Sequence, residues 1–320
     1  MKKFFAFALA TLLILSGIVF STGCDLQDNT TWTFDELTGT LTISGTGHMK
    51  SYRSSAAPWS EYDIKHIQIQ DGVISVGSSA FSDCTSVISV SLPASVKEIG
   101  SYAFFDCTAL TSVSFSEGLT YIGYSSFYNC ASLESVVLPE GLTTIEESAF
   151  GGCDSLQYIS VPDSLKKLGC YAFPVSPGIS NSFGYSLKYN TTSDGTLYLG
   201  NENNPYLILI KPSTETISCD VQKTTKFIYD QAFARGENLT SVTISDSVIS
   251  VGYLLFENNQ SITTVTVPKS VKNIGEAAFR GCHNVRDIYF DGLKKEAKKV
   301  FAEADLPNSA IIHCTDGDIK

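Results

Sequence analysis

The sequence is short of charge. Only 17% of its 320 residues are charged, whereas roughly 25% is usual in soluble domains. Lys plus Arg number 22 against 33 Asp plus Glu, which gives a formal net charge of −11 at pH 7. An acidic chain without a basic run does not follow a phosphate backbone, so we expect no nucleic-acid partner. Hydroxyl groups take the place of charges, since the chain holds 41 Ser and 28 Thr.

The sequence also lacks the motifs of common catalytic and metal sites. It has no HExxH, GxSxG or P-loop motif, no GxGxxG after a strand, and no paired CxxC spacing of a structural zinc site. The four histidines stand in none of these contexts: His48, His66, His283 and His313. We therefore expect a protein that is not an enzyme and that holds no cofactor and no metal.

Only one long apolar run is present, at the N-terminus. Two lysines precede the uncharged run Phe4 to Phe20, and small residues then lead to Cys24, which is the layout of a secretory signal. Small residues before a cysteine resemble a bacterial lipobox, in which the cysteine becomes the lipidated first residue. We predict a signal peptide over 1–23 and a lipid anchor on Cys24. Ordinary cleavage near Gly23 and an uncleaved membrane anchor are the alternatives.

A repeat organises the rest of the chain. Its marker is a phenylalanine that recurs eight times, at Phe81, Phe104, Phe127, Phe150, Phe173, Phe233, Phe256 and Phe279. Every gap is 23 residues except the gap of 60 between Phe173 and Phe233, which is one repeat plus an insertion of 37. An apolar residue stands five positions before each phenylalanine, and a glycine stands four positions before most of them.

Each repeat carries the pattern of a short strand. Val90 and Leu92 alternate with Ser89 and Ser91, which is the period of two that is typical of a strand. Such a coil is too short to bury its own apolar edge, so stacked coils bury one another and form a solenoid. We expect the phenylalanines to form an aromatic spine and the strands of successive coils to pair in parallel, about 4.8 Å apart. We expect the glycines to supply backbone freedom where the coil turns.

These repeats resemble a known family. One unit that carries the resemblance comprises Leu92, Pro93, Val96, Ile99, Gly100, Ala103, Phe104, Cys107 and Leu110. The same pattern recurs at Leu138, Pro139, Leu142, Ile145, Ala149, Phe150, Cys153 and Leu156. The pattern is similar to the BspA-like leucine-rich repeats of bacterial cell-surface proteins, and it extends over roughly 64–290. The resemblance implies an α/β-type repeat solenoid dominated by short parallel β-strands, and a role in adhesion to host proteins, other cells or extracellular matrix.

The ends of a solenoid expose an apolar coil and need caps. Alternating apolar residues on either side of a turn at 35–39 predict a β-hairpin at the N-terminal end, with Trp59 closing the first coil. Leu293, Ala297, Val300 and Phe301 have helical spacing, and a last strand is predicted over 310–314. The predicted organisation is a signal peptide over 1–23, an N-terminal β cap over 24–63, leucine-rich repeats over 64–173, a β-rich insertion over 174–212, further repeats over 213–290 and a C-terminal cap over 291–320.

The insertion is predicted to be a small β-excursion from the solenoid. Strands are expected over 185–189, 196–199 and 206–210, separated by turn-rich links. An excursion on a rigid scaffold often carries binding. A neutral decoration is an equally good interpretation of this segment.

Most cysteines share one column of the repeat. Cys84, Cys107, Cys130, Cys153 and Cys282 each stand three positions after a phenylalanine. Side chains one coil apart lie near 4.8 Å, which does not suit the Cβ separation of about 3.8 Å in a disulfide. We predict a buried ladder of free thiols, because Gly236 and Asn259 fill the same column elsewhere. A bridge between Cys170 and Cys219 across the insertion is left open.

The outward strand positions form the candidate binding face. They alternate with the buried positions and are mostly hydroxyl residues with occasional aromatics. We predict partner contacts at Ser89, Ser91, Ser112, Ser114, Tyr158, Ser160, Thr243, Thr264, Thr266 and Tyr289, centred on the two tyrosines because aromatics dominate binding energy. The expected function is non-catalytic binding of a host, matrix or other cell-surface protein by an exported protein that meets the membrane only through its lipid anchor. The rivals are a structural envelope protein and a receptor for a glycan or small ligand.

Overall fold

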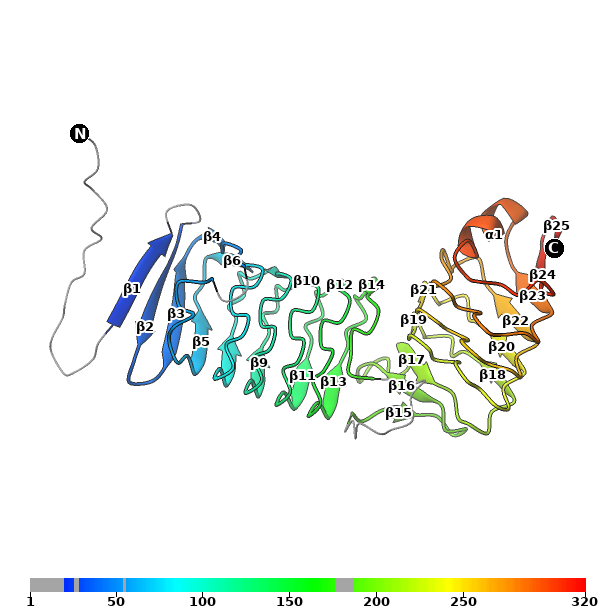
Figure 1. Ribbon diagram of the computed structural model, residues 1–320, viewed down its shortest axis with the longest axis horizontal. Coiled ribbons are helices and arrows are strands. Elements are labelled where there is room, and N and C mark those ends of the chain that lie inside the picture. Colours follow the sequence, from blue (N-terminus) through cyan, green and yellow to red (C-terminus); the bar gives the residue numbers. More distant parts are fainter. Residues whose placement is uncertain (1–19, 26–28, 54–55, 176–186) are drawn as a thin grey trace.

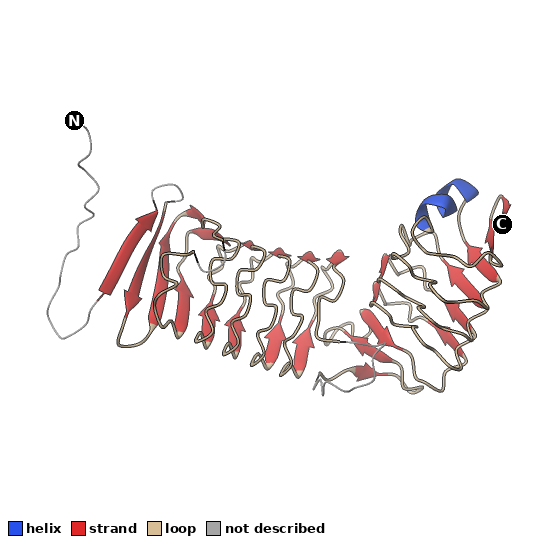
Figure 2. Cartoon of the chain, in the orientation of Figure 1, coloured by secondary structure: helices blue, strands red, loops and turns tan. Residues whose placement is uncertain are grey.

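The computed structural model describes residues 20–25, 29–53, 56–175 and 187–320. The chain forms a β-solenoid of about 11 turns. Successive coils lie side by side along the long axis, and this axis bends where residues 187–211 lie (Figure 1). Strands and turns make up nearly all of the described chain, and a short helix lies near the C-terminal end (Figure 2). The predicted fold class is therefore confirmed.

Most coils contribute one strand to each of two parallel ladders, and each ladder is divided into separate sheets. The first ladder comprises β5 (His66–Ile69), β7 (Ser89–Ser91), β9 (Ser112–Ser114), β11 (Ser135–Val137), β13 (Tyr158–Ser160), β18 (Ser218–Asp220), β20 (Ser241–Thr243), β22 (Thr264–Val267) and β23 (Asp287–Phe290). The second comprises β6 (Val73–Val76), β8 (Glu98–Ile99), β10 (Tyr121–Ile122), β12 (Thr144–Ile145), β14 (Lys167–Leu168), β19 (Phe227–Ile228) and β21 (Ser250–Val251). Partners lie one repeat apart, as Val90 and Val113 do. Because of this register, corresponding inward-facing residues of successive coils lie next to one another.

The buried phenylalanines form two stacks rather than one spine. In the first, the ring centroids of Phe81, Phe104, Phe127, Phe150 and Phe173 follow one another at 5.1 to 6.3 Å. Trp59 begins this stack at 5.5 Å from Phe81, and Tyr229 ends it at 6.1 Å from Phe173. The second stack contains Phe233, Phe256 and Phe279. The spine is divided because the chain re-enters the solenoid after the insertion with Tyr229, and not Phe233, against Phe173.

The glycine column has a different role from the predicted one. Gly100 and Gly123 do not have a positive φ. A Cβ atom on them would lie 2.6 Å from the backbone nitrogen of Ser78 and 2.7 Å from that of Ser101, respectively. These glycines therefore allow neighbouring coils to approach closely. One column of left-handed residues lies two positions before each phenylalanine: Ser79, Tyr102, Ser125, Ser148, Tyr171, Gln231, Leu254 and Ala277. A second lies two positions after most of them: Asp83, Asp106, Asn129, Gly152, Arg235, Asn258 and Gly281. Neither is the glycine column four positions before the phenylalanine. The prediction that glycine supplies the turn conformation is thus wrong.

The N-terminal cap is the predicted hairpin. Strands β2 (Thr30–Asp35) and β3 (Thr40–Gly45) pair antiparallel, and β1 (Phe20–Asp25) adds an antiparallel strand outside them. Strand β3 also pairs in parallel with β5, and the short β4 (Gly47–His48) pairs with β6. The buried indole of Trp59 donates a hydrogen bond from Nε1 to the Ala80 carbonyl at 2.9 Å. Trp59 therefore closes the first coil, as expected.

The C-terminal cap consists of the predicted helix and strand with one more strand. Helix α1 spans Lys294–Val300, and β24 (Ile311–Cys314) pairs in parallel with β23. Strand β25 (Gly317–Ile319) then pairs antiparallel with β24. Ala297 and Val300 are buried, but Leu293, which was expected on the same buried face, is 50% exposed. Leu293 stands at the N-cap with an extended backbone, outside the helical spacing that would direct it inward.

The insertion is an integral part of the solenoid and not a separate excursion. Strands β15 (Asn190–Thr191), β16 (Leu197–Leu199) and β17 (Ile208–Lys211) form an antiparallel unit, and β17 then pairs in parallel with β19. Residues 207–210 are fully buried, so this segment supplies core. It was misjudged because its apolar run was assigned to a strand without a partner. The expected strand over 185–189 is not formed in its described part, 187–189, and residues 185–186 lie outside the described residues.

The cysteine column forms a ladder of thiol hydrogen bonds. The Sγ atoms of Cys107, Cys130 and Cys153 donate to the carbonyls of Phe81, Phe104 and Phe127 at 3.2 to 3.3 Å. Where asparagine fills the column, the Asn259 side chain donates to the Phe233 carbonyl at 3.0 Å. The eight cysteines beyond residue 28 are free thiols, including Cys170 and Cys219. In these coils a small group in the column satisfies one buried backbone carbonyl.

Candidate functional site

The predicted binding residues of the first half lie in register on two neighbouring strands. Ser89 of β7 lies opposite Ser112 of β9, and Ser91 lies opposite Ser114. Three of these serines are exposed and Ser89 is half-buried. The ring nitrogen Nδ1 of His66 lies 2.8 Å from the Ser89 hydroxyl one coil away. The outward rows of hydroxyl groups are thus formed, and hydrogen bonds between coils use some of the donors and acceptors of these groups.

The residues of the second half form a similar pair of rows. Thr243, Thr266 and Tyr289 are successive partners across β20, β22 and β23, and Thr264 lies opposite Asp287 in the neighbouring row. The tyrosine is 47% exposed. These four predicted residues share one continuous sheet, which ends at the C-terminal cap.

The structure separates the two tyrosines on which the prediction was centred. Tyr158 lies on β13 opposite Ser135 of β11, in a two-stranded sheet that also contains Ser160. Tyr289 lies in a different, six-stranded sheet. A single small-ligand site formed by both rings is therefore wrong. A face that contacts a large partner at several places is compatible with this separation.

Tyr289 belongs to a titratable cluster at the cap. Its ring stacks on His313 at a centroid distance of 4.9 Å. His313 lies 2.9 Å from an Asp287 carboxylate oxygen through Nε2 and 3.0 Å from Asp318 through Nδ1. Hydrogen bonds to Asp287 and then Asp318 raise the pKa of His313 above its ordinary 6.5. The cluster joins β23, β24 and β25, so it fixes the cap beside the binding face.

A second exposed surface lies on the turns that carry the phenylalanines, and the sequence analysis missed it. We call it the tyrosine edge: Tyr102, Phe105, Tyr124, Tyr128, Tyr171 and Tyr253. The four tyrosines that are most accessible are 37% to 39% exposed. The Tyr102 ring lies 5.2 Å from that of Tyr124, and Phe105 stacks on Tyr128 at 5.4 Å. The signal in the sequence was the recurrence of aromatic residues one to three positions from the phenylalanine column.

The tyrosine edge continues across the junction between the two halves of the solenoid. In regular coils the N–H two residues before the phenylalanine bonds to a carbonyl of the next coil, as Tyr102 bonds to Tyr124 at 2.8 Å. At the junction a side chain takes this role for Tyr171, whose N–H donates to one oxygen of Asp230 at 2.6 Å. The other oxygen of Asp230 accepts from the N–H of Tyr253, three residues before Phe256, at 2.7 Å. Burial raises the pKa of Asp230, which is 2% exposed.

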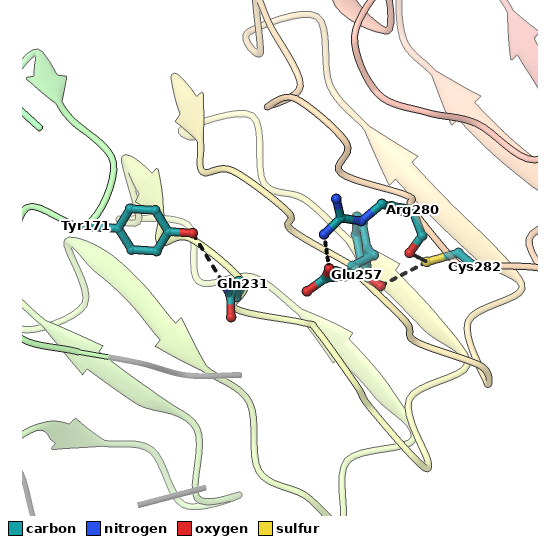
Figure 3. Close-up of polar contacts among 6 residues, drawn as sticks. Tyr171, Gln231, Glu257, Arg280 and Cys282 are labelled. Carbon is teal, nitrogen blue, oxygen red and sulfur yellow. Dashed lines mark hydrogen bonds and ion pairs between the residues drawn. The ribbon is translucent and has the colours of Figure 1, made fainter. Parts of the chain in front are cut away.

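Tyr229 replaces backbone at the same junction. Its hydroxyl accepts from the Phe173 N–H at 2.8 Å and donates to the Phe173 carbonyl at 3.0 Å. On the surface, the Gln231 side chain donates to the Tyr171 hydroxyl at 3.2 Å (Figure 3). Two consecutive side chains, Tyr229 and Asp230, therefore join the halves where a whole coil would otherwise continue.

A cleft of about 410 Å³ opens at this junction. Its lining includes the carboxylates of Glu146, Glu147, Asp230 and Glu276, together with Tyr253. One cation also lines it, Lys167, whose ammonium pairs with Glu146 at 2.6 Å. The cleft therefore has an excess of negative charge and an aromatic side chain in its wall.

Other predicted chemistry is placed as follows. Cys24 lies in β1 opposite Thr31 of β2, and its lipidation stays a prediction. Within the described ranges, no group of three or more His, Cys, Asp or Glu side chains could hold a metal ion. Among the described residues, no helix is long and apolar enough to cross a membrane.

Comparison with known proteins identifies the repeats. The family model of the BspA type leucine rich repeat region matches six copies, over residues 56–180 and 212–316. No curated protein matches the chain. Among solved structures, a leucine-rich repeat protein from Eubacterium ventriosum is 23% identical, with a TM-score of 0.47, and the match covers 85% of this chain and 73% of that one.

Two further solved structures are more distant. A leucine rich cell surface protein from Faecalibacterium prausnitzii is 20% identical with a TM-score of 0.38, over 89% of this chain and 98% of that one. The pneumococcal vaccine antigen PcpA is 19% identical with a TM-score of 0.39, over 84% and 76%. The family match covers well over half of the sequence, and its repeat is the coil described above. The chain therefore belongs to the BspA-type leucine-rich repeat family.

Proposed function

We propose that the protein is a non-catalytic binding protein of the bacterial cell surface, which contacts a host, matrix or other cell-surface protein through its outward strand face. The observation that carries the proposal is the register of that face. In the first half, the exposed Ser91, Ser112 and Ser114 lie in register with the half-buried Ser89. In the second half, the exposed Thr243 and Tyr289 lie in register with the half-buried Thr264 and Thr266. Solenoids use such extended, rigid surfaces for recognition.

The composition of the face favours a protein partner. Hydroxyl groups on a solvated sheet can hydrogen-bond a partner without the desolvation that charged groups require. Tyr158 and Tyr289, which are 43% and 47% exposed, supply the apolar area on which interface energy concentrates. Because the two rings lie on different sheets, both are used only by a partner large enough to span the bend.

Binding to intact cells and to immobilised matrix proteins tests this function. The purified protein is compared with the double variant Tyr158→Ala, Tyr289→Ala. The matched control is Ile74→Ala, Ile249→Ala, which removes apolar side chains that are 38% and 40% exposed and lie on neither the outward strand face nor the tyrosine edge. We expect saturable binding that the first variant loses and the control keeps. Absence of saturable binding by the unaltered protein sinks the proposal and favours a purely structural envelope role.

Membrane attachment through Cys24 is a separate part of the proposal. It rests on the apolar run Phe4 to Phe20 followed by small residues and the cysteine. Fractionation of cells that carry Cys24→Ala tests it. Release of the variant into the medium is the expected result, and unchanged retention with the membrane contradicts lipidation at this residue.

A further inference from the structure

We propose that the tyrosine edge binds an extended, arginine-bearing segment of a partner protein, with one guanidinium group in the cleft at the junction. This surface is distinct from the strand face, so the proposal goes beyond the function given above. It begins from the exposed rings, because accessible aromatic side chains in mutual contact mark sites of association more strongly than isolated ones.

The rings form two groups along the solenoid. In the first, Tyr102 touches both Phe105 and Tyr124, with centroids 5.7 and 5.2 Å apart, and Phe105 stacks on Tyr128, so these contacts link two successive coils. In the second, the rings of Tyr171 and Tyr253 lie 6.3 Å apart across the junction. The coil of Phe150, which adds no ring to this edge, lies between the groups. An occupant that reaches both groups is therefore an extended polypeptide that lies along the axis.

The charge of the edge selects a cationic occupant. In the first half the turns hold Asp83, Asp106 and Glu147 and no Lys or Arg, over residues 78–83, 101–106, 124–129, 147–152 and 170–175. The corresponding turns of the second half, 230–235, 253–258 and 276–281, hold three carboxylates and two arginines: Asp230, Glu257, Glu276, Arg235 and Arg280. Carboxylates therefore outnumber guanidinium groups by six to two. Tyrosine faces attract cations through their ring quadrupole, and carboxylates beside them add Coulomb attraction. An anionic or neutral segment gains neither the attraction to the ring faces nor the attraction to the carboxylates.

The cleft supplies the strongest point of attachment. Asp230 is 2% exposed, and the N–H groups of Tyr171 and Tyr253 hold its carboxylate in one orientation. Glu147 and Glu276 line the same cleft at exposed positions. A cation between them relieves the cost of burying the Asp230 charge, the cost that raises the pKa of this carboxyl group.

The geometry of the cleft favours guanidinium over ammonium. Tyr253 lines the cleft, and its ring lies 6.3 Å from that of Tyr171 at an interplanar angle of 67°, so a flat group can face the Tyr253 ring while it points at the carboxylates. Arginine stacks on aromatic faces and binds carboxylates through a planar fork, whereas lysine is a point charge. On the same edge the chain already pairs a guanidinium with a carboxylate, that of Arg280 with Glu257 (Figure 3).

Fluorescence anisotropy with labelled nonapeptides tests the proposal on the full chain. The probe repeats Gly-Ser-Arg, and matched probes carry lysine or neutral citrulline in place of arginine. We expect the arginine probe to bind most tightly and the citrulline probe not to bind. Equal binding of the arginine and lysine probes contradicts the guanidinium assignment, and binding of the citrulline probe contradicts the role of charge.

Variants then locate the site. Glu147→Gln, Glu276→Gln is expected to weaken the arginine probe by roughly tenfold, since two exposed ion pairs together contribute about 1.4 kcal/mol, which is a factor of ten. Tyr124→Leu, Tyr128→Leu is expected to weaken it by several-fold. The control Glu117→Gln, Glu134→Gln removes the same charge from exposed positions off the edge. An equal loss in this control shows nonspecific attraction and overturns the site.

Two further measurements separate this site from its neighbours. Competition with free spermidine tests a small polyamine as the ligand; displacement that is stronger than that by the unlabelled arginine peptide overturns the polypeptide assignment. The strand-face variant Tyr158→Ala, Tyr289→Ala should bind the arginine probe as the unaltered protein does. Thermal unfolding of every variant checks that it is folded. If a double variant is unfolded, the single variants Glu147→Gln and Tyr128→Leu decide the test in its place.

Discussion

Substitution of Tyr229 by phenylalanine will weaken the junction between the two halves of the solenoid. The change removes one oxygen atom and keeps the ring that ends the first aromatic stack against Phe173. It therefore tests a single idea, that a side-chain hydroxyl replaces the backbone of a missing coil. The ring packing stays, so no cavity larger than the lost oxygen contributes to the result.

The magnitude follows from the two groups that the hydroxyl serves. It accepts from the Phe173 N–H at 2.8 Å and donates to the Phe173 carbonyl at 3.0 Å, in a place where Tyr229 is 1% exposed. Each buried backbone group left without a partner costs about 1–3 kcal/mol. We therefore expect Tyr229→Phe to lower the free energy of unfolding by about 2–4 kcal/mol, the lower half of the sum, because the main chain can relax at a bend.

Chemical denaturation followed by circular dichroism measures this loss. Tyr128→Phe, which removes a hydroxyl from an exposed ring, is the matched control and should change stability by less than about 0.5 kcal/mol. Since repeat proteins are stabilised by contacts between neighbours, the weakened junction should also separate one unfolding transition into two. A loss below about 0.5 kcal/mol in Tyr229→Phe would refute the idea that this hydroxyl replaces backbone.

Three further predictions follow from individual contacts. Gly123→Ala should cost about 1–3 kcal/mol in chemical denaturation, because its Cβ would lie 2.7 Å from the Ser101 nitrogen; an unchanged midpoint contradicts the close-approach explanation. Cys130→Ala should cost about 1–3 kcal/mol because the Phe104 carbonyl loses its thiol donor, whereas Cys130→Ser should cost less; equal losses argue against the hydrogen bond. The raised pKa of His313 gives stability that is complete below 6.5 and is lost as the pH rises through the folded-state value. Thermal unfolding across this range should show that fall, and His313→Gln should remove it.

The repeat made most of the architecture predictable. A residue such as Val90 or Phe104 recurs at one spacing in many coils. Comparison of the coils therefore shows which positions need an apolar side chain, even where one coil departs from the pattern. Alternation within each unit assigned the buried face of the strands, and the hydroxyl rows lie where it placed them. The caps were also predictable, because a solenoid must cover its terminal coils.

Departures from the repeat were not predictable in the same way. Tyr229 and Asp230 interrupt the glycine and neighbouring columns, and in the sequence they look like failures of the pattern. The structure shows that these two side chains accept hydrogen bonds from the N–H groups of Phe173 and Tyr171, which backbone carbonyls accept in other coils. Whether a side chain can replace backbone in this way depends on the length of the insertion and on the point at which the chain re-enters the solenoid. A periodic sequence pattern contains no information on either.

The tyrosine edge shows how such departures point to function. Tyr102 and Tyr171 have φ values of 58° and 52°, at a position where Ser79 and Ser125 serve other coils. A left-handed conformation costs a residue with a side chain about 1–2 kcal/mol relative to glycine, and a bulky ring gains no relief from it. The left-handed conformation belongs to this position in all eight coils, so it does not by itself distinguish the two tyrosines. Their rings are 39% and 37% exposed, which is more than a residue of the core, and the serines at the same position show that the scaffold needs no ring there. A partner that covers the exposed part of the rings explains why tyrosine stands at these two positions.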